Sequence, residues 1–558
     1  MRDYDEITSF LGEWGPFQRT IFILLSLSTV PNGYAGMSMV FLSDTPSHHC
    51  RLPYQNRTNI NEKQDLPVGE RKPHLDYSSC TRYNWLNSTF SNETGACMDG
   101  WDYSTEQYVS TIVTEWNLVC DDAWKVPFSL SVYFMGVLTG SFICGHISDR
   151  FGRKIVLFIT MAVQTIFSLL QVVSVSWEMF CILFFIVGVG QISNYVAAFV
   201  LGTELLGKSS RVTFSTLGVC VFYALGYAVL PLCAYFIRSW RMLLLVLSLP
   251  GFLYIPLWWL IPESPRWLLA QGRIKEAEAI VRAAAKKNGV RPPEVIFLDE
   301  DSSKFVQNGT DSRNTSYTYL DLVRTSKMRN ITILNVIIWF FITISYFGLS
   351  LNTPNMNGDP YLNCLLFALI ELGAYIGAWL LLKVASRRTI ITSSLLTGAT
   401  VLLLIHLVPQ ELSIISTVLA MMGKFGITAA FAVVYISATE LFPTVVRGMG
   451  VGVCSMASKI GSTVSPYFAF MGTYNKALPY IVMGLLTLTV GLLSLLLPET
   501  QHIALPEDLS QVQPLNCCCC RSEPTPGQQG LQEVQCVAEE KHTSPSDAKL
   551  LSCQTAAL

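Results

Sequence analysis

The stretch GHISDRFGRK (residues 145–154) decides how this chain is built, because it bridges two long apolar runs at 127–148 and 155–175. Its glycines permit a tight turn. Its acidic and basic side chains can join neighbouring helix ends by charge-assisted hydrogen bonds and release them again. An ordinary basic loop is the alternative, but agreement at six spaced positions favours a gating loop. The six positions are Gly145, Asp149, Arg150, Gly152, Arg153 and Lys154.

The composition places this loop in a membrane protein. Hydrophobic residues make up 51% of the 558 residues and charged residues only 14%, against roughly 25% charged in soluble proteins. A water-soluble enzyme is therefore excluded, and the net charge of −2 gives no basic excess that would suggest nucleic acid. We predict an all-α membrane protein with twelve transmembrane helices, since only a helix of about 20 residues satisfies its backbone in hydrocarbon. The predicted helices are 20–42, 127–148, 155–175, 179–203, 213–236, 242–261, 331–352, 361–382, 389–409, 412–437, 446–471 and 478–498.

The two halves of the chain repeat one another. A set of landmark residues recurs at a constant offset of 236 residues. We infer two six-helix bundles related by duplication, 20–261 and 331–498, joined by a charged central loop at 262–330. In transporters built from such repeats the substrate site lies between the bundles, near the membrane midplane. The recurring pairs are Gly190 and Gly426, Glu204 and Glu440, Arg211 and Arg447, and Glu263 and Glu499.

Basic residues in the short loops predict the orientation. With the segment 1–19 and the tail 499–558 in the cytoplasm, nine Lys and Arg residues lie in short inner loops and three in short outer loops. Cytoplasmic loops carry the excess of Lys and Arg, so this orientation is the expected one. The segment 1–19 is polar, and the apolar run after it is too long for the core of a cleavable signal peptide.

The large loop at 43–126 is then expected outside the cell. Its four cysteines can form two disulfides in three possible connectivities. Three N-glycosylation sequons lie in the same loop, whereas those at Asn308, Asn314 and Asn330 are expected in the cytosol. We predict a disulfide-linked, glycosylated outer loop and no structural metal site. The cysteines are Cys50, Cys80, Cys97 and Cys120, and the outer sequons begin at Asn56, Asn87 and Asn92.

Two further features are predicted at the inner side. The counterpart of the gating loop in the second half, Lys383 to Arg388, is degenerate, which predicts an asymmetric gate. A Glu and an Arg seven residues apart lie at matching helix ends in both halves. We interpret these pairs as conformational latches, with simple helix-end ion pairs as the alternative. The pairs are Glu204 with Arg211 and Glu440 with Arg447.

The segment from Gly202 to Ser209 matches the P-loop pattern. A P-loop needs a strand before it and a helix N-terminus after it to hold phosphate. Here an apolar helix ends at the motif, so a helix-ending turn is the better interpretation and no ATP is expected. The matching residues are Gly202, Gly207, Lys208 and Ser209.

Two ionisable residues are predicted deep in the membrane, Glu371 in the run 361–382 and Lys459 in the run 446–471. Intramembrane charges are functional hypotheses by default. These two either neutralise one another or face one cavity from two sides.

Aromatic and amide side chains lie at a similar depth. Aromatic rings can hold a quaternary ammonium by cation–π attraction, and core packing is the alternative. Amide oxygens can coordinate sodium or bind substrate, with hydrogen bonding between helices as the alternative. We predict sodium at Asn32 and Asn194, and assign Gln164 to the substrate. The aromatic residues are Tyr195, Tyr223, Trp339, Tyr346 and Phe431.

The gating loop is the signature of the major facilitator superfamily, and with six other segments it resembles the organic cation/carnitine transporters of the solute carrier 22 family. The resemblance runs from residue 1 to about 500 and implies sodium-coupled uptake of carnitine or ergothioneine, with some organic cation transport. The family's helix-11 position is a cation in carnitine-type members, so Lys459 is expected to bind a substrate carboxylate. The segments are FLGEWGPFQR (10–19), VPNG (30–33), TEWNLVC (114–120), GQISNY (190–195), PESPRWLL (262–269) and GDPYLNC (358–364).

The whole sequence thus predicts a monomeric, multi-pass sodium symporter of the plasma membrane. A sodium-independent organic cation facilitator and an ATP-binding membrane enzyme are the alternatives. The stretch from Arg273 to Lys287 predicts a cytoplasmic amphipathic helix. Cys517 to Cys520 in the tail, which is expected to be disordered, predict S-palmitoylation, or are simply tolerated there.

Overall fold

A computed structural model describes residues 4–51, 80–86, 89–97, 100–297, 318–443, 445–501, 506, 512 and 515. By its contacts the chain divides into two units, Met1–Leu515 and Asn516–Leu558. The second unit, with Cys517 to Cys520, lies outside the described residues. Asn56, Asn87 and the side chain of Asn92 also lie outside them, so the glycosylation sites remain predictions.

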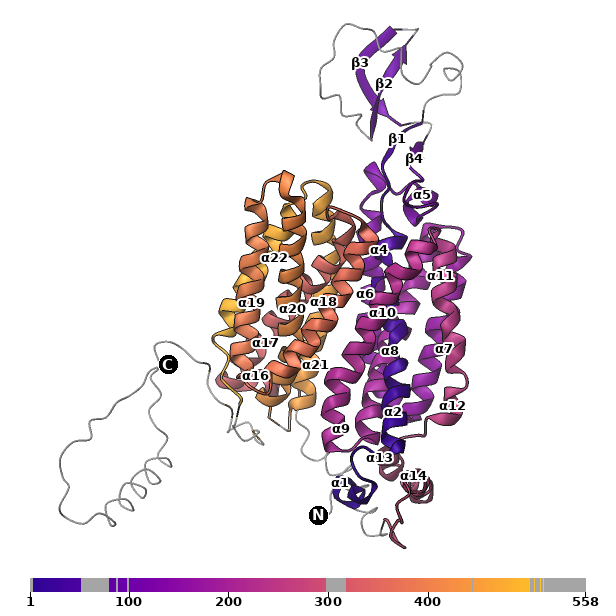
Figure 1. Cartoon of the computed structure of the whole chain (residues 1–558), viewed down its shortest axis with the longest axis vertical. Helices are drawn as coiled ribbons and strands as arrows, with labels where there is room; N and C mark the ends of the chain where they lie inside the picture. The colour runs from indigo at the N-terminus through magenta and orange to yellow at the C-terminus, as the bar shows by residue number, and fades with distance from the viewer. Residues whose placement is uncertain are drawn as a thin grey trace, which may run out of the picture. The chain divides into compact units, whose positions relative to one another are not determined.

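The first half of the chain forms one helical bundle (Figure 1). Its first crossing is interrupted at Ser28 and Thr29, whose hydroxyls donate back to the carbonyls of Leu25 and Ser26 at 2.7 Å. Pro31 follows at once, and it has no N–H with which to continue the helical ladder. The crossing therefore runs as α2 (Pro16–Leu27), α3 (Val30–Met37) and α4 (Met39–Leu42). The other crossings are α6 (Lys125–Phe151), α7 (Arg153–Val172), α8 (Trp177–Leu205), α9 (Lys208–Thr213) continuing through a π-helical turn (Phe214–Gly218) into α10 (Val219–Phe236), and α11 (Trp240–Ser248) continuing into α12 (Leu257–Leu260).

The second half forms a bundle of six helices of its own (Figure 1). They are α17 (Ser326–Leu351), α18 (Pro360–Leu381), α19 (Arg387–Leu404), α20 (Ser413–Leu441), α21 (Arg447–Phe470) and α22 (Leu478–Ser494).

Among the described residues, nine helices are long and apolar enough to cross a membrane. The remaining three crossings are the interrupted first one, α21 and α22. The helix α21 carries Lys459 and many small polar residues, and α22 has only 17 residues. With these three the predicted twelve-helix architecture is confirmed, and two of them, the interrupted crossing and α21, carry predicted site residues.

The outer loop forms a small β-rich cap. Strand β1 (His48–Cys50) pairs with β4 (Trp101–Tyr103), and β2 (Thr81–Leu86) with β3 (Thr89–Ala96), both antiparallel. Disulfides join Cys50 to Cys97 and Cys80 to Cys120, which settles the open connectivity. The short helix α5 (Ile112–Trp116) ties the cap to the bundle, because its Glu115 accepts a hydrogen bond from Trp240 Nε1 at 2.7 Å.

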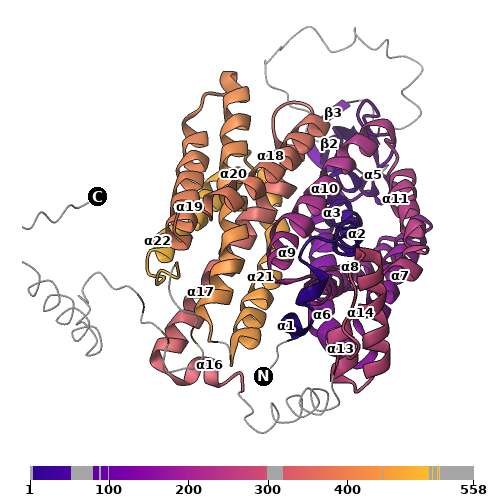
Figure 2. The same ribbon diagram turned by 60° about the horizontal axis from the view of Figure 1, so that its bottom comes forward.

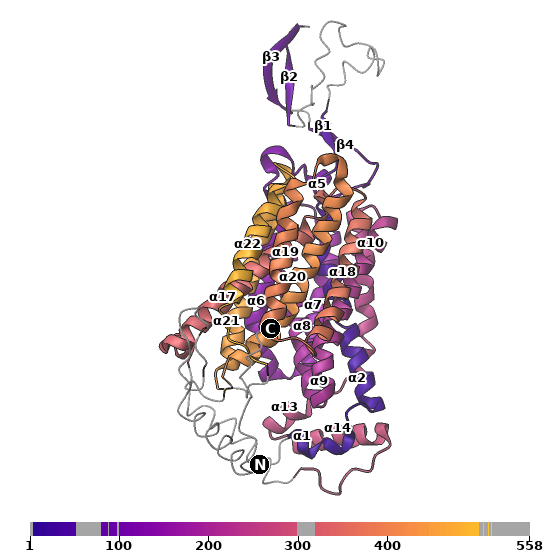
Figure 3. The ribbon, with the colours of Figure 1, turned by 60° about the vertical axis from the view of Figure 1, so that its left-hand side comes forward.

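The inner segments pack beneath the first bundle (Figure 3). Helices α1 (Tyr4–Ile7), α13 (Pro265–Ala270) and α14 (Ile274–Asn288) share one apolar cluster that includes Tyr4, Trp267 and Val281. The predicted amphipathic helix of the central loop is thus confirmed as α14. A short helix, α16 (Asp321–Arg324), leads into the second bundle.

Two helix pairs join the bundles, α6 with α21 and α10 with α18 (Figure 2). Ser131 Oγ of α6 donates to the Thr463 carbonyl of α21 at 2.7 Å. Tyr361, at the start of α18, stacks on Phe41 with ring centres 5.2 Å apart and donates to the Gln107 carbonyl at 3.0 Å. These contacts hold the bundles together at the end that carries the disulfides.

Candidate functional site

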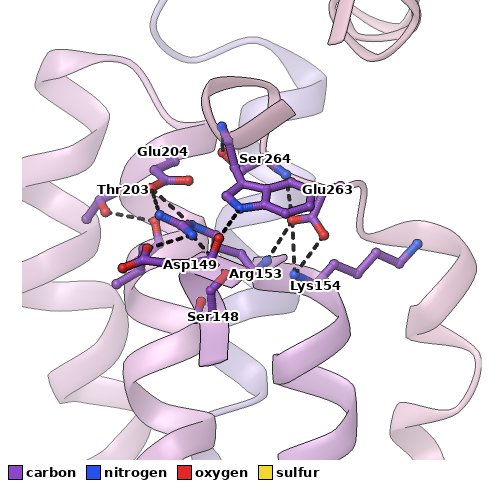
Figure 4. Close-up of polar contacts among 10 residues, drawn as sticks. Ser148, Asp149, Arg153, Lys154, Thr203, Glu204, Glu263 and Ser264 are labelled. Carbon is purple, nitrogen blue, oxygen red and sulfur yellow. Dashed lines mark hydrogen bonds and ion pairs between the residues drawn. The ribbon is translucent and has the colours of Figure 1, made fainter. Parts of the chain in front are cut away.

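The predicted gating loop is the junction of α6 and α7, and one arginine holds it (Figure 4). Arg153 forms an ion pair with Asp149 at 2.8 Å and with Glu204 of α8 at 3.3 Å. It also donates to the Ser148 carbonyl oxygen at 2.9 Å. The Arg153 side chain is only 13% exposed, and its contacts join α6, α7 and α8 at one end of the bundle.

Glu263, which follows the last crossing of the first bundle, caps the same junction (Figure 4). Its Oε1 accepts hydrogen bonds from the backbone N–H groups of Arg153 and Lys154, both at 3.0 Å. A carboxylate at a helix N-terminus satisfies N–H groups that lack a partner within the helix and is attracted by the helix dipole. Gly152 has a φ of +106°, and a Cβ there would lie 2.5 Å from Glu263 Oε2, so only glycine allows this approach.

The second bundle repeats this arrangement although its loop sequence is degenerate. Arg387, at the start of α19, forms an ion pair with Glu440 of α20 at 3.3 Å. Thr500 Oγ1 donates to Glu440 Oε2 at 2.5 Å, from the other side of the junction. The expectation of an asymmetric gate was therefore wrong. The loop residues of the two halves differ, but in both an arginine at the start of one helix binds a glutamate of the next helix. Glu440 is the counterpart of Glu204 in the repeat, 236 residues further along the chain.

The two predicted latches, Glu204 with Arg211 and Glu440 with Arg447, have other partners. Both glutamates bind the arginine of a neighbouring helix, as described above. In each pair a turn lies between the glutamate and the arginine seven residues later. The arginine therefore lies beyond the end of the helix that carries the glutamate, and it donates hydrogen bonds to carbonyl groups at that helix end. Arg211 Nε donates to Thr203 O at 2.7 Å, and Arg447 Nε donates to Phe442 O at 3.3 Å.

Glu499 is expected to make stability depend on acidic pH. Burial acts to raise the pKa of its carboxyl group, but hydrogen bonds from the Ser386 side chain and from the backbone N–H groups of Gln501, Thr500 and Arg387 outweigh it, so the pKa is lowered. The resulting stabilisation is present at neutral pH and is lost as the pH falls through the folded-state pKa. We expect E499Q to unfold at a lower temperature than the wild type at pH 7, and the difference to shrink as the pH falls below the ordinary glutamate pKa of about 4.3. A difference that persists in acid, or one matched by the exposed control E411Q, contradicts this assignment.

A third deep charge, which the sequence patterns did not single out, lies inside the second bundle. Lys424 of α20 and Glu371 of α18 are both fully buried and form an ion pair, with Nζ 3.2 Å from Oε2. The Lys424 ammonium donates to Ser350 Oγ at 2.6 Å and lies 3.4 Å from the ring centre of Tyr346. The hydroxyls of Tyr346 and Tyr375 donate to Glu371 Oε1 at 2.5 and 3.1 Å. Buried charges persist only when they are paired and hydrogen-bonded, and both charges meet that condition here.

This pair corrects the expectation that Glu371 and Lys459 are the only deep charges. The partner of Glu371 is Lys424, so Glu371 and Lys459 do not neutralise one another. Lys459 lies in the middle of α21, half-buried, and within the described ranges no carboxylate approaches it within ion-pair distance. The sequence did contain the missing signal, because Lys424 stands inside the predicted crossing 412–437.

The predicted aromatic set divides between the bundles. Tyr346 stacks on Phe431 with ring centres 5.3 Å apart, and Trp339 lies 6.5 Å from Phe431. Trp339 is fully buried, and the ring of Tyr346 is already occupied by the Lys424 ammonium. Neither of these two rings is therefore open to a substrate. Tyr435, which was not among the predicted rings, packs 4.2 Å from Trp339 and is 37% exposed. Of these four rings, Phe431 and Tyr435 are therefore the two that are not fully buried.

The other two predicted aromatic residues, Tyr195 and Tyr223, belong to the first bundle, and both are half-buried. Tyr223 lies against the interrupted first crossing: a Cβ added at Gly36 would be 3.1 Å from its hydroxyl. Glycine at this position therefore leaves room for the tyrosine hydroxyl beside α3.

The sodium candidates lie beside the interruption of the first crossing. Asn32 and Asn194 are each 1% exposed, and the Oδ1 atom of each lacks a hydrogen-bond partner among the described residues. Asn194 Nδ2 points to the break itself, 3.5 Å from the Ser28 carbonyl. Gln191, a further amide, donates to the Asn32 carbonyl at 2.8 Å. Carbonyl groups freed where a helix unwinds are typical sodium ligands in transporters. Here Ser28 and Thr29 keep right-handed helical dihedrals, so the buried Oδ1 atoms of Asn32 and Asn194 are the ligands that could hold a sodium ion.

Gln164 belongs with these amides. Together with Asn194 it lines a cavity of about 40 Å³ inside the first bundle, beside Ser38 and Tyr254. The lining surface of the cavity is mostly apolar, with several polar side chains, and its volume corresponds to about two or three water molecules. Gln164 therefore lines a cavity inside the first bundle, and its assignment to the substrate stays a prediction.

The P-loop match forms a turn between two helices. An α-helix, α8, precedes it and ends at Leu205, and Gly207 is the N-cap of α9. Gly202 packs under the ring of Phe214, since a Cβ there would lie 2.2 Å from that ring. The predicted helix-ending turn is confirmed; the side chains of Lys208 and Ser209 lie outside the described residues.

Comparison with known proteins shows the family to which this chain belongs. Residues 82–508 match the family described as sugar (and other) transporters. The human organic cation/carnitine transporter 2 is 53% identical over 532 residues, covering 92% of this chain and 94% of the relative. Mouse solute carrier family 22 member 4 is 52% identical over 529 residues, covering 92% and 95%. This chain belongs to the organic cation/carnitine transporters of solute carrier family 22. It is therefore a membrane transporter and not an enzyme.

The solved structures support the same fold. The xylose transporter XylE from E. coli, in a partially occluded inward-open conformation, matches with a TM-score of 0.61 at 15% identity, covering 88% of this chain and all of XylE. The inward-open form of XylE matches with a TM-score of 0.58. The major facilitator architecture predicted from the sequence is thus confirmed.

Proposed function

We propose that this transporter takes up zwitterionic quaternary-ammonium compounds of the carnitine or ergothioneine type, coupled to sodium, by alternating access. Its family relationship supports small organic cation or carnitine-like substrates. The observation that supports a zwitterionic substrate is the position of Lys459, a half-buried cation at the middle of α21. The other deep charge predicted from the sequence, Glu371, is already neutralised by Lys424.

The two ends of a betaine would then meet different groups. Its carboxylate binds Lys459, because a charge-assisted hydrogen bond repays the desolvation of both ions better than a neutral contact does. Its ammonium end lies against the accessible rings of Phe431 and Tyr435, with Tyr223 on the facing bundle. Cation–π attraction contributes about 0.5–2 kcal/mol for each good contact. Glu371 acts through Lys424 and Tyr346 rather than as a free anion for the substrate.

The sodium ion would bind at Asn32 and Asn194, whose side-chain oxygens are buried without a donor in the described structure. A zwitterion adds no net charge, so each coupled sodium carries one positive charge inward. The membrane potential then supplies about 2.3 kcal/mol per 100 mV. A bound sodium ion would order the interruption of the first crossing. Because Tyr223 lies beside α3, sodium binding would then also fix the position of Tyr223.

The two arginine junctions at the inner ends are proposed to open and close as the bundles rock. Residues of both junctions are charged, so each junction can be broken and re-formed without exposing apolar surface. We also propose the plasma membrane as the site of action, with both termini in the cytoplasm and the disulfide-linked cap outside, because disulfides persist in an oxidising space.

The test is uptake of carnitine, ergothioneine and tetraethylammonium in one cell line, with sodium present and with sodium replaced by N-methylglucamine. We expect sodium replacement to abolish uptake of at least one betaine and to spare tetraethylammonium. Equal betaine uptake in both media supports a sodium-independent organic cation facilitator instead.

Substitution of the sodium candidates gives a sharper result. We expect N32A and N194A each to raise the sodium concentration needed for half-maximal betaine uptake about 10-fold, because one oxygen ligand is lost. Tetraethylammonium uptake should not change. N335A removes a buried amide of the second bundle that donates to a carbonyl of its own helix and serves as the matched control. Unchanged sodium dependence in both first-bundle variants contradicts the assigned site.

A further inference from the structure

We propose that an inner surface at the end of α14 binds the headgroups of anionic phospholipids. The region where the end of α14 meets the start of α2 carries four exposed cations and one exposed indole ring, and we call it the basic corner. Its residues are Trp14, Arg19, Lys286, Lys287 and Arg291. This inference depends on the proposed orientation of the chain but not on the transported substrate.

The side chain of Asn288 fixes the depth of the basic corner in the membrane. It accepts a hydrogen bond from the Phe17 N–H at 2.8 Å and donates to the Leu11 carbonyl at 3.0 Å. It also donates to Gln18 Oε1 at 2.8 Å. Because Phe17 lies in the first turn of the membrane helix α2, the end of α14 is held where that helix leaves the hydrocarbon. Figure 3 shows α14 lying across the lower end of α2.

The four cations of the basic corner form no ion pair with the described residues. Two other arginines of the same segment, Arg273 and Arg282, have carboxylate partners on α14 at 2.6 Å. No such partner lies within ion-pair distance of the four cations of the basic corner in the described ranges. An external anion is therefore the partner that this surface fits.

The helix dipole does not account for the four cations. It favours basic residues in the last turn of a helix, as at Lys286 and Lys287. Arg19 lies instead in the first turn of α2, where the dipole disfavours a cation, and Arg291 lies beyond the end of α14. A negatively charged lipid surface explains all four positions, since basic clusters beside a membrane helix attract anionic lipids.

The indole of Trp14 favours a lipid rather than a soluble anion. It is 38% exposed and lies just before α2, the helix that carries Arg19. Tryptophan is enriched where membrane meets water, because its ring is amphipathic. A phospholipid offers both the phosphate for the cations and the acyl boundary for this ring.

The test uses the purified full-length transporter in nanodiscs of phosphatidylcholine with and without phosphatidylserine. We expect the anionic lipid to raise the thermal unfolding midpoint of the wild type by several degrees, because a ligand of the folded state stabilises it. R19A/K286A/K287A/R291A should lose this increase while unfolding like the wild type in pure phosphatidylcholine. K275A removes an exposed lysine about 16 Å away along α14 and should keep it.

Three outcomes would overturn the proposal. One is an equal increase in the quadruple variant and the wild type, and another is an equal loss in K275A. The third is a full increase when soluble glycerophosphoserine is added to pure phosphatidylcholine nanodiscs, which would assign the surface to a free phosphate. If the quadruple variant unfolds early even in pure phosphatidylcholine, the pair K286A/K287A measures the same difference with α2 intact.

Discussion

Replacing Lys459 by alanine is expected to reduce the kcat/KM for betaine uptake about 10- to 100-fold, while tetraethylammonium uptake is retained. A hydrogen bond to a charged group contributes about 1.5–3 kcal/mol, and each 1.4 kcal/mol is a factor of about ten. Lys459 is half-buried at the middle of α21 and has no carboxylate within ion-pair distance in the described structure. Removing the Lys459 side chain therefore removes the counter-ion of the substrate carboxylate, and it leaves no buried acid of the protein without a partner in the described structure.

The controls separate recognition of the carboxylate from damage to the fold. K459R should keep most betaine uptake, because the charge remains and arginine adds a bidentate fork. K476A, in the exposed segment between α21 and α22, should behave like the wild type. Surface expression is measured by biotinylation in each case. Normal uptake of both carnitine and ergothioneine by K459A at equal surface expression would falsify the assigned role.

Breaking the Glu371–Lys424 pair is expected to have the largest effect on stability. Removing one partner of a buried ion pair costs about 3–5 kcal/mol, because the remaining charge is left without compensation. Both side chains are fully buried, so K424M leaves the Glu371 carboxylate with only two tyrosine hydroxyls. E371Q leaves the Lys424 ammonium with Ser350 and the ring of Tyr346. We expect either single variant to be retained inside the cell and to unfold at a clearly lower temperature when purified.

The double variant E371Q/K424M tests the pair itself. Replacing a whole buried ion pair by uncharged groups of similar volume is often neutral, and the amide oxygen that E371Q introduces can still accept from Tyr346 and Tyr375. We therefore expect the double variant to recover most of the stability that each single variant loses. A double variant no more stable than the singles contradicts the pairing. Recovered stability without uptake would show that the pair also acts in the transport cycle.

Much of the fold could be predicted from the sequence. Apolar runs of about 20 residues require helices in lipid, because each helix satisfies its own backbone locally. The constant offset between halves predicted two bundles, and the charged loop at 145–154 predicted a junction of helix ends. The same local reasoning separated the P-loop match from a true P-loop, because a helix and not a strand precedes it.

The partners within the site could not be predicted from spacing. Glu204 and Arg211 are close in sequence, yet a turn separates them, and Glu204 binds Arg153, which lies 51 residues away. The acid partner of Lys424 likewise lies on another helix, and without Lys424 the prediction could relate Glu371 only to Lys459, either as its partner or across one cavity. The disulfides join residues 47 and 40 positions apart in one of three possible ways.

The sequence by itself determined the twelve crossings, the duplication, and which charges and amides enter the membrane. Only the tertiary structure decided that Lys424 neutralises Glu371, that Tyr346 holds an ammonium of the protein, and that no carboxylate of the described residues lies within ion-pair distance of Lys459. The physical reason is the range of the interactions. Backbone hydrogen bonds in a helix close within about four residues, so the local sequence fixes them. Ion pairs and ring contacts depend on which helix faces meet, and that is settled only when the helices pack.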